Sequence, residues 1–164
     1  MSEQTSQNLA GEKPLPKEAK PVLGAAHDML DVFVGEWKGE GKAAGDTPMT
    51  VEESYARLEG GFFLTTTFDR KVGEARQKGV GSIGYDAENN VYSMHAIDSL
   101  GYDRTYELED VGDTWTLSGD RERATYTFKG DGRLHVLWEH RPDGGAWQPL
   151  CEYDLTNSSK ARPH

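Results

Sequence analysis

Residues 79–97 read GVGSIGYDAENNVYSMHAI, two apolar segments separated by a polar turn. The first segment, Gly79 to Tyr85, and the second, Val91 to Ile97, have the length and the β-favouring residues of strands. The residues between them, Asp86 to Asn90, are of the types that form turns. A connection this short joins antiparallel neighbours, so the stretch predicts a β-hairpin.

The same pattern of short strands and polar turns extends in both directions from this hairpin. Apolar side chains alternate with polar ones, as expected for strands with one buried face. In the last segment, Trp147, Cys151, Tyr153 and Leu155 are predicted to share a face. The turns Asp110–Asp113, Lys129–Gly132 and Pro142–Gly145 are rich in residues that favour tight turns. The expected strands run through residues 35–41, 51–55, 62–68, 79–85, 91–97, 102–108, 115–117, 124–128, 134–138 and 147–155.

About ten short strands fit either a β-sandwich or a closed barrel. A barrel leaves no exposed edge, and a sandwich needs longer crossover connections than this chain has. Between Gly24 and Phe33, apolar residues fall at helical spacing. We therefore predict an all-β fold, an antiparallel up-and-down β-barrel, with one short N-terminal helix.

Three regions of the chain are distinguished by composition. Residues 1–23 hold three prolines and almost no large apolar side chains, which predicts a disordered tail. Residues 24–157 are expected to form the barrel domain, and residues 158–164 a frayed C-terminus.

The charge and the cysteine content limit the partners. A net charge of −10, from 28 acidic and 18 basic residues, argues against nucleic acid and against an anionic membrane surface. The single cysteine, Cys151, cannot form an intramolecular disulfide, and the first thirty residues lack the order of a secretion signal. We expect a soluble, cytoplasmic protein without a metal site, and we leave a homodimer open.

The run Gly35-Glu36-Trp37-Lys38-Gly39-Glu40-Gly41 follows the predicted helix directly. Its odd positions share one face of a strand, so Trp37 lines the same side as Gly35, Gly39 and Gly41. The missing side chains let another backbone, or a flat ligand, come close. We expect Trp37 to plug the closed end of the barrel.

This run resembles the opening of calycin-type barrels, in particular nitrobindin and related small bacterial barrels of unassigned function. The resemblance continues in Gly60–Leu64, Gly81–Asp86 and Ile97–Gly101, and covers about residues 28–156. The later segments are more similar to the uncharacterised branch than to nitrobindin. The resemblance implies a lipocalin-like barrel with an internal cavity.

Nitrobindin is a haem protein, and its iron is held by a histidine in the last strands. The corresponding segment here, Leu150–Leu155, contains no histidine, which leaves Cys151 and Tyr153 as candidate iron ligands. Haem binding is therefore disfavoured, and no cofactor is expected.

Three polar residues lie on faces that otherwise look buried: Glu53, Arg104 and His140. A buried charge must be paired, so Arg104 either pairs with Glu53 or Asp98 or holds the carboxylate of a ligand. His95 lies in a strand whose two faces are both half-apolar, and its direction is left open.

Two main functions fit these residues. The first is a small-molecule-binding barrel for a largely apolar or aromatic ligand with a polar or acidic end. The second is a cofactor-free cyclase or isomerase in which Glu53, His95 or Tyr106 moves a proton. A nitrobindin-like protein that binds haem or nitric oxide is a further alternative. The candidate ligand-binding residues are Tyr55, Arg104, Tyr106, Trp138, His140 and Tyr153.

Overall fold

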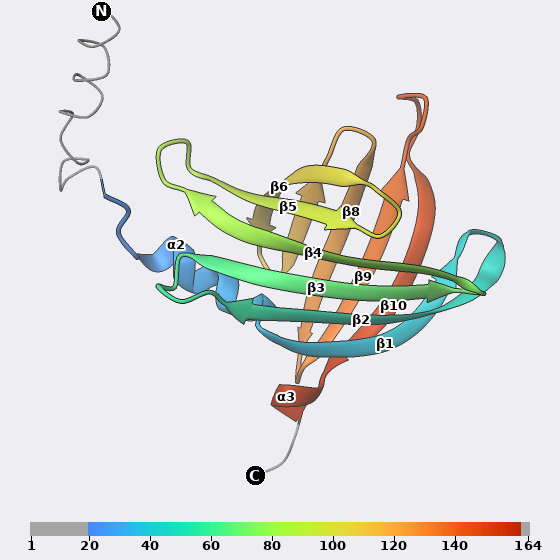
Figure 1. The fold of residues 1–164 in the computed structure, drawn as a ribbon, viewed down its shortest axis with the longest axis horizontal. Coiled ribbons are helices and arrows are strands. Elements are labelled where there is room, and N and C mark those ends of the chain that lie inside the picture. Colours follow the sequence, from blue (N-terminus) through green and yellow to red (C-terminus); the bar gives the residue numbers. More distant parts are fainter. Residues whose placement is uncertain (1–19, 162–164) are drawn as a thin grey trace, which may run out of the picture.

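The computed structural model describes residues 20–161, which form one closed antiparallel β-barrel of ten strands (Figure 1). Each strand pairs with its neighbours along the chain, and β1 pairs with β10 to close the barrel. The predicted fold class is confirmed. The elements are α2 (Ala25–Asp28), the 3₁₀ helix η2 (Met29–Phe33), β1 (Gly35–Ala43), the 3₁₀ helix η3 (Ala44–Asp46), β2 (Thr47–Arg57), β3 (Phe63–Val72), β4 (Ala75–Asp86), β5 (Val91–Asp98), β6 (Asp103–Val111), β7 (Thr114–Ser118), β8 (Glu122–Gly130), β9 (Arg133–His140), β10 (Gln148–Asn157) and α3 (Ser158–Ala161).

The alternation of the sequence decides which side chains enter the barrel. In β2, for example, Met49, Val51, Glu53 and Tyr55 are buried, while their neighbours on the other face are more exposed. Side chains of successive residues point to opposite faces of a strand, so these four line the interior. A charged residue, Glu53, is therefore carried into the barrel by the same pattern as its apolar neighbours.

The helical segment covers one end of the barrel, which we call the closed end (Figure 1). Leu30 and Phe33 of η2 are buried there, and the Trp37 indole nitrogen donates to the backbone oxygen of Phe33 at 2.8 Å. The Tyr92 hydroxyl donates to the backbone oxygen of Ala26 at 2.8 Å and fixes α2. The predicted helix is present as one α-helical turn continued by a 3₁₀ turn, a common ending for short helices.

The opposite end, which we call the open end, carries the hairpin turns β1–β2, β3–β4, β5–β6, β7–β8 and β9–β10. In the β5–β6 turn, Asp98 Oδ1 accepts from the backbone nitrogens of Leu100 and Tyr102 at 2.9 and 3.1 Å. The aspartate thus satisfies two backbone donors of the turn, as aspartates in turns commonly do.

The chain ends differ in part from the expectation. Most of the predicted disordered tail, residues 1–19, lies outside the described residues, as do residues 162–164. Ser158–Ala161 form a helical turn where a frayed end was predicted. Asn157 explains the difference, because its Oδ1 accepts from the Ser159 backbone nitrogen at 3.1 Å and from the Ser159 hydroxyl at 2.6 Å. Among residues 20–161 no helix is long and apolar enough to cross a membrane.

The prediction that Trp147 shares the inward face of β10 is wrong. The strand begins only at Gln148, and its register shifts between Pro149 and Cys151. Such a β-bulge moves preceding residues off the face that the alternation predicts. The Trp147 ring instead lies between two guanidinium groups, 4.3 Å from that of Arg123 and 4.5 Å from that of Arg141.

Candidate functional site

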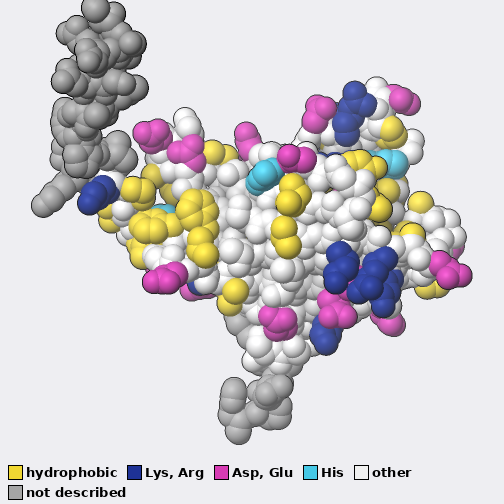
Figure 2. Space-filling view, in the orientation of Figure 1, with side chains coloured by type: hydrophobic (Ala, Val, Ile, Leu, Met, Phe, Trp, Pro, Cys, Tyr) yellow, Lys and Arg dark blue, Asp and Glu magenta, His cyan; other side chains and the backbone are white. Residues whose placement is uncertain are grey.

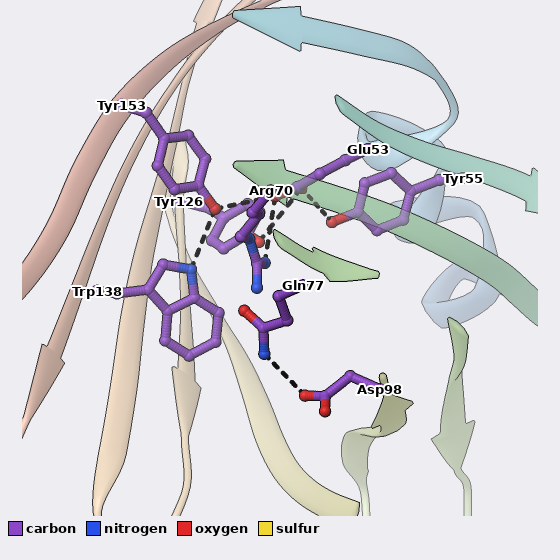
Figure 3. A network of polar contacts seen from close by, with 8 residues as sticks. All are labelled: Glu53, Tyr55, Arg70, Gln77, Asp98, Tyr126, Trp138 and Tyr153. Carbon is purple, nitrogen blue, oxygen red and sulfur yellow. Dashed lines mark hydrogen bonds and ion pairs between the residues drawn. The ribbon is translucent and has the colours of Figure 1, made fainter. Parts of the chain in front are cut away.

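Glu53 is a carboxylate buried in the middle of the barrel (Figure 3). The hydroxyls of Tyr55 and Tyr126 donate to its Oε1 at 2.8 and 3.4 Å. The Tyr153 hydroxyl donates to its Oε2 at 2.9 Å. Because a buried carboxylate is costly unless its lone pairs are filled, these three phenols make the buried position possible.

The three phenols act as donors and keep their protons. Burial first, and then the negative charge of Glu53, raise the pKa of Tyr55, Tyr126 and Tyr153. At neutral pH each hydroxyl is therefore protonated and available to the carboxylate.

Arg70 lies beside this carboxylate and is held much more loosely. Its Nη2 is 3.4 Å from Glu53 Oε2, and its buried Nε has no hydrogen-bond partner among the described residues. The guanidinium carbon is 4.5 Å from the centre of the Phe68 ring and 5.7 Å from that of Trp138. Burial lowers the pKa of Arg70, but the neighbouring acidic groups of Tyr153 and Glu53 raise it overall, so the charge is retained.

A cavity of about 280 Å³ lies between this network and the open end of the barrel. Phe68, Met94, Tyr106 and Trp138 form apolar wall, and Arg70 lines the cavity beside them. Ala43 and Ala96 contribute small side chains to the same lining. The cavity is thus mainly apolar, with a cationic group next to Glu53.

Most charged groups around this cavity have close partners of their own. Arg104 forms an ion pair with Glu122, whose other oxygen accepts from the Tyr106 hydroxyl at 2.8 Å. Asp98 accepts from the Gln77 amide at 2.7 Å in addition to its two backbone donors. Arg76 is held by Asp69 through hydrogen bonds of 3.0 and 2.7 Å. Arg70 is the exception, with a single long contact.

A second, wider hollow of about 630 Å³ lies mostly over the outer face of β1 to β5. Exposed side chains such as Glu36, Lys38, Glu52 and Lys78 line much of it. Acidic and basic side chains are interspersed over the face of the molecule shown in Figure 2. Solvated charges of both signs are ordinary for a protein surface, so the inner cavity is the better candidate site.

The structure brings some predicted site residues to the cavity and others beneath it. Arg104, Tyr106 and Trp138 line the cavity. Tyr55 and Tyr153 do not reach its lining, because their hydroxyls are bound to Glu53. His140 is half-buried at the end of β9 and also lies outside the lining.

Two sequence expectations need correction. His95 was a candidate acid or base, but it points outward, where its Nε2 is 2.5 Å from Asp103 Oδ1. Met94 and Ala96 take the inward positions on either side of it. The predicted pairing of Arg104 with Glu53 or Asp98 is wrong, because the closed sheet places Arg104 next to Glu122.

Sequence reasoning missed Arg70, Glu122 and Gln77. A signal for Arg70 was present, since the inward series Leu64, Thr66, Phe68 continues to it at a spacing of two. The run Asp69-Arg70-Lys71 reads instead as a solvated strand end. Glu122 is concealed in the same way within the charged run Asp120 to Arg123.

The glycines of the first strand allow a close approach of backbone. A Cβ at Gly39 would lie 1.7 Å from the backbone oxygen of Asp154 in β10, and one at Gly41 2.0 Å from that of Glu152. Gly35 has φ +141° and would meet the side chain of Asn157. Trp37 packs against the Phe128 ring at the closed end, with centroids 5.9 Å apart.

The two residues considered as haem ligands do not fit that role. The Tyr153 hydroxyl is buried, donates to Glu53 and accepts from the Trp138 indole at 3.1 Å. Burial raises the pKa of the Cys151 thiol to about 11, which disfavours the thiolate that would bind iron. Among the described residues, no cluster of three or more His, Cys, Asp or Glu could hold a metal ion.

The fold recurs in a solved structure with little sequence identity. The crystal structure of Rv2717c from M. tuberculosis matches with a TM-score of 0.63 and 16% identity, over 84% of this chain and 99% of that one. A de novo designed fluorescence-activating β-barrel matches with a TM-score of 0.44 and 13% identity, over 80% and 98%. No curated protein sequence matches the chain.

A protein-family model matches residues 23–156, from just before α2 nearly to the end of β10. The match therefore includes all ten strands and every residue that lines the cavity. The chain belongs to the DUF1579 family, which is described as a protein of unknown function.

Proposed function

We propose that this chain is a small-molecule-binding barrel that holds a largely apolar ligand with a polar or acidic end in its inner cavity. The observation that carries the proposal is the cavity of about 280 Å³, which has aromatic walls and convergent polar groups at the open end of a closed barrel. Sites for small molecules combine these two features.

The residues that line the cavity contribute to binding in two ways. Phe68, Met94 and Trp138 offer apolar contact area for the body of a ligand, and aromatic side chains favour flat ligands through stacking. Arg70 offers donors for its polar end, whereas the Tyr106 hydroxyl already donates to Glu122. Glu53 does not line the cavity, so it acts through the residues that it holds.

The proposal is tested by filling the cavity. The full chain is titrated with 1-naphthol, a neutral bicyclic probe, by isothermal titration calorimetry, and native mass spectrometry of the freshly purified protein detects retained ligand. The variant Ala96→Phe places a ring in the cavity, whereas Ser93→Phe adds the same ring to the exposed face of the same strand.

We expect wild type and Ser93→Phe to bind 1-naphthol and Ala96→Phe to lose binding. Equal binding by Ala96→Phe and wild type would contradict the inner site. So would an absence of binding in wild type together with an empty mass spectrum.

A cofactor-free enzyme of the cyclase or isomerase kind is a second candidate, and one observation favours it. Tyr106 lines the cavity and donates to Glu122 at 2.8 Å, so a phenol and a carboxylate are paired beside the ligand space. Burial, and next the charge of Glu122, raise the pKa of Tyr106, so at neutral pH the phenol keeps its proton and is a hydrogen-bond donor rather than a base. If turnover of a bound compound is found, Tyr106→Phe should abolish it while binding persists.

A further inference from the structure

We propose that Arg70 is the anchor of the site, and that the ligand is a monocarboxylic acid of roughly eleven non-hydrogen atoms with an aromatic body. This inference rests on the proposed binding function and adds the chemical class of the ligand. It replaces Arg104, which sequence reasoning favours as the anchor.

The first step concerns which cation is free to bind. Arg104 is committed to Glu122, and Arg76 is committed to Asp69. Glu53 has close phenol donors in Tyr55 and Tyr153, so it does not depend on Arg70 to fill its lone pairs. Arg70 therefore has uncommitted N–H groups on a side chain that lines the cavity, and its buried Nε has no partner among the described residues.

The second step concerns the direction of those N–H groups. The rings of Phe68 and Trp138 lie within cation–π distance of the guanidinium. The remaining hydrogen bonds of a guanidinium lie in its plane, where a carboxylate fits as a bidentate partner. In Figure 3 the Arg70 side chain extends from the side of Glu53 towards Gln77, another residue of the cavity wall.

The third step concerns charge. The Glu53 carboxylate, 3.4 Å from the guanidinium, offsets part of its charge, so the second negative charge of a phosphate monoester would be left unbalanced and a singly charged ligand is favoured. A buried guanidinium with unpaired donors also favours a ligand that supplies acceptors, since each unsatisfied buried donor is costly.

The fourth step concerns size. An apolar cavity of about 150 Å³ binds benzene, which has six carbon atoms. In the same proportion, the cavity of about 280 Å³ takes roughly eleven non-hydrogen atoms. 3-Phenylpropionate has this size, as do its amide and phenyl phosphate, so the three form a set matched in size and different in charge.

The experiment compares these three probes with 1-naphthol on the full chain by isothermal titration calorimetry at pH 7. We expect wild type to bind 3-phenylpropionate about tenfold or more tighter than 3-phenylpropanamide, because hydrogen bonds to charged groups are the stronger ones. Phenyl phosphate should bind more weakly than the propionate.

Two variants move the preference in opposite directions. Arg70→Gln should bind acid and amide equally, whereas Glu53→Gln removes the competing anion and should tighten the acid but not the amide. Arg123→Gln loses the same charge from the outer face, where Arg123 pairs with Glu139, and should keep the wild-type preference.

The outcomes separate this inference from the function on which it rests. If 1-naphthol and the amide bind wild type as tightly as the acid, or phenyl phosphate binds best, the carboxylate assignment is overturned and the binding barrel stands. A preference for the acid that survives in Arg70→Gln also overturns it. If none of the four probes binds and native mass spectrometry detects no retained ligand, the proposed function itself fails.

Discussion

The two halves of the barrel interior are built on the same ten strands and filled in different ways. At the closed end the Phe33 ring lies 5.3 Å from that of Trp115 and 5.2 Å from that of Phe128, and the interior is packed. At the open end Ala43 and Ala96 leave a cavity of about 280 Å³. The comparison teaches that alternation decides which side chains point inward, while their size and charge decide whether the space is filled.

The largest expected effect is at the packed end. Phe33→Ala should lower the free energy of unfolding by about 3–5 kcal/mol, because the lost ring leaves a cavity among fixed neighbours. Met94→Ala, in the cavity wall, should cost about 2 kcal/mol, because that side chain already borders open space. Urea denaturation measures both, and equal losses would remove the distinction between the two ends.

The next test concerns the carboxylate of Glu53, which lies between the packed half and the hollow half of the interior. Glu53→Gln should cost about 1.5–3 kcal/mol, because glutamine keeps the volume and an acceptor but leaves the buried Arg70 without a counter-charge. Thermal unfolding followed by circular dichroism measures the loss. The double variant Glu53→Gln with Arg70→Met should recover part of it, and no recovery would mean that the pair does not interact.

Larger side chains should distinguish the hollow part of the interior from the packed part, with smaller effects on stability than the variants above. Ala124→Leu, at a buried position outside the cavity lining, should cost about 1–3 kcal/mol through overpacking. Ala96→Leu adds the same atoms to the cavity wall and should change stability by less than about 1 kcal/mol while it weakens 1-naphthol binding. A larger loss of stability for Ala96→Leu than for Ala124→Leu would contradict the assignment of the cavity.

The smallest expected effect lies on the outer face and depends on pH. Nδ1 of His135 is 2.8 Å from Asp154 Oδ1, and its Nε2 is 2.7 Å from Glu152 Oε2. Partial burial lowers the pKa of His135, but hydrogen bonds with Asp154 and then Glu152 raise it overall.

A raised pKa stabilises the folded state fully below the unfolded value of about 6.5, and this contribution is lost as pH rises through the folded pKa. His135→Gln should therefore cost less than about 1 kcal/mol at pH 5.5 and nothing at pH 9, since both carboxylates are largely exposed. Chemical denaturation at the two pH values checks this. A greater loss of stability at pH 9 than at pH 5.5 would contradict a raised pKa for His135.

The sequence predicts the barrel well because its evidence is local. Alternation and turn residues locate strands such as Gly79–Tyr85 and Val91–Ile97 without knowledge of their partners. The pairs in the site depend instead on how the sheet curls and closes. Glu53 and Arg70 lie on adjacent strands, but whether Arg104 reaches Glu53 or Glu122 depends on the register around the whole barrel.

Two misreadings have simple physical causes. Arg70 and Glu122 lie in charged runs, and a charged strand end is usually solvated, so composition concealed their inward position. The direction of His95 was open because both faces of its strand are mixed: the apolar Ile97 shares a face with Ser93 and His95, and the charged Asp98 shares the other with Met94 and Ala96. Only the pairing of β5 with β4 and β6 fixes which face is inside.

The seam between β1 and β10 makes the folding of the barrel depend on one nonlocal step. All other strand pairs join neighbours along the chain and can form as hairpins while the sheet is still open. The last pair brings Trp37 opposite Asn157, and its entropy of loop closure must be overcome before its hydrogen bonds form. We expect amide hydrogens shared by β1 and β10 to exchange with solvent sooner than those between β8 and β9, because the barrel opens along the line where it closed last.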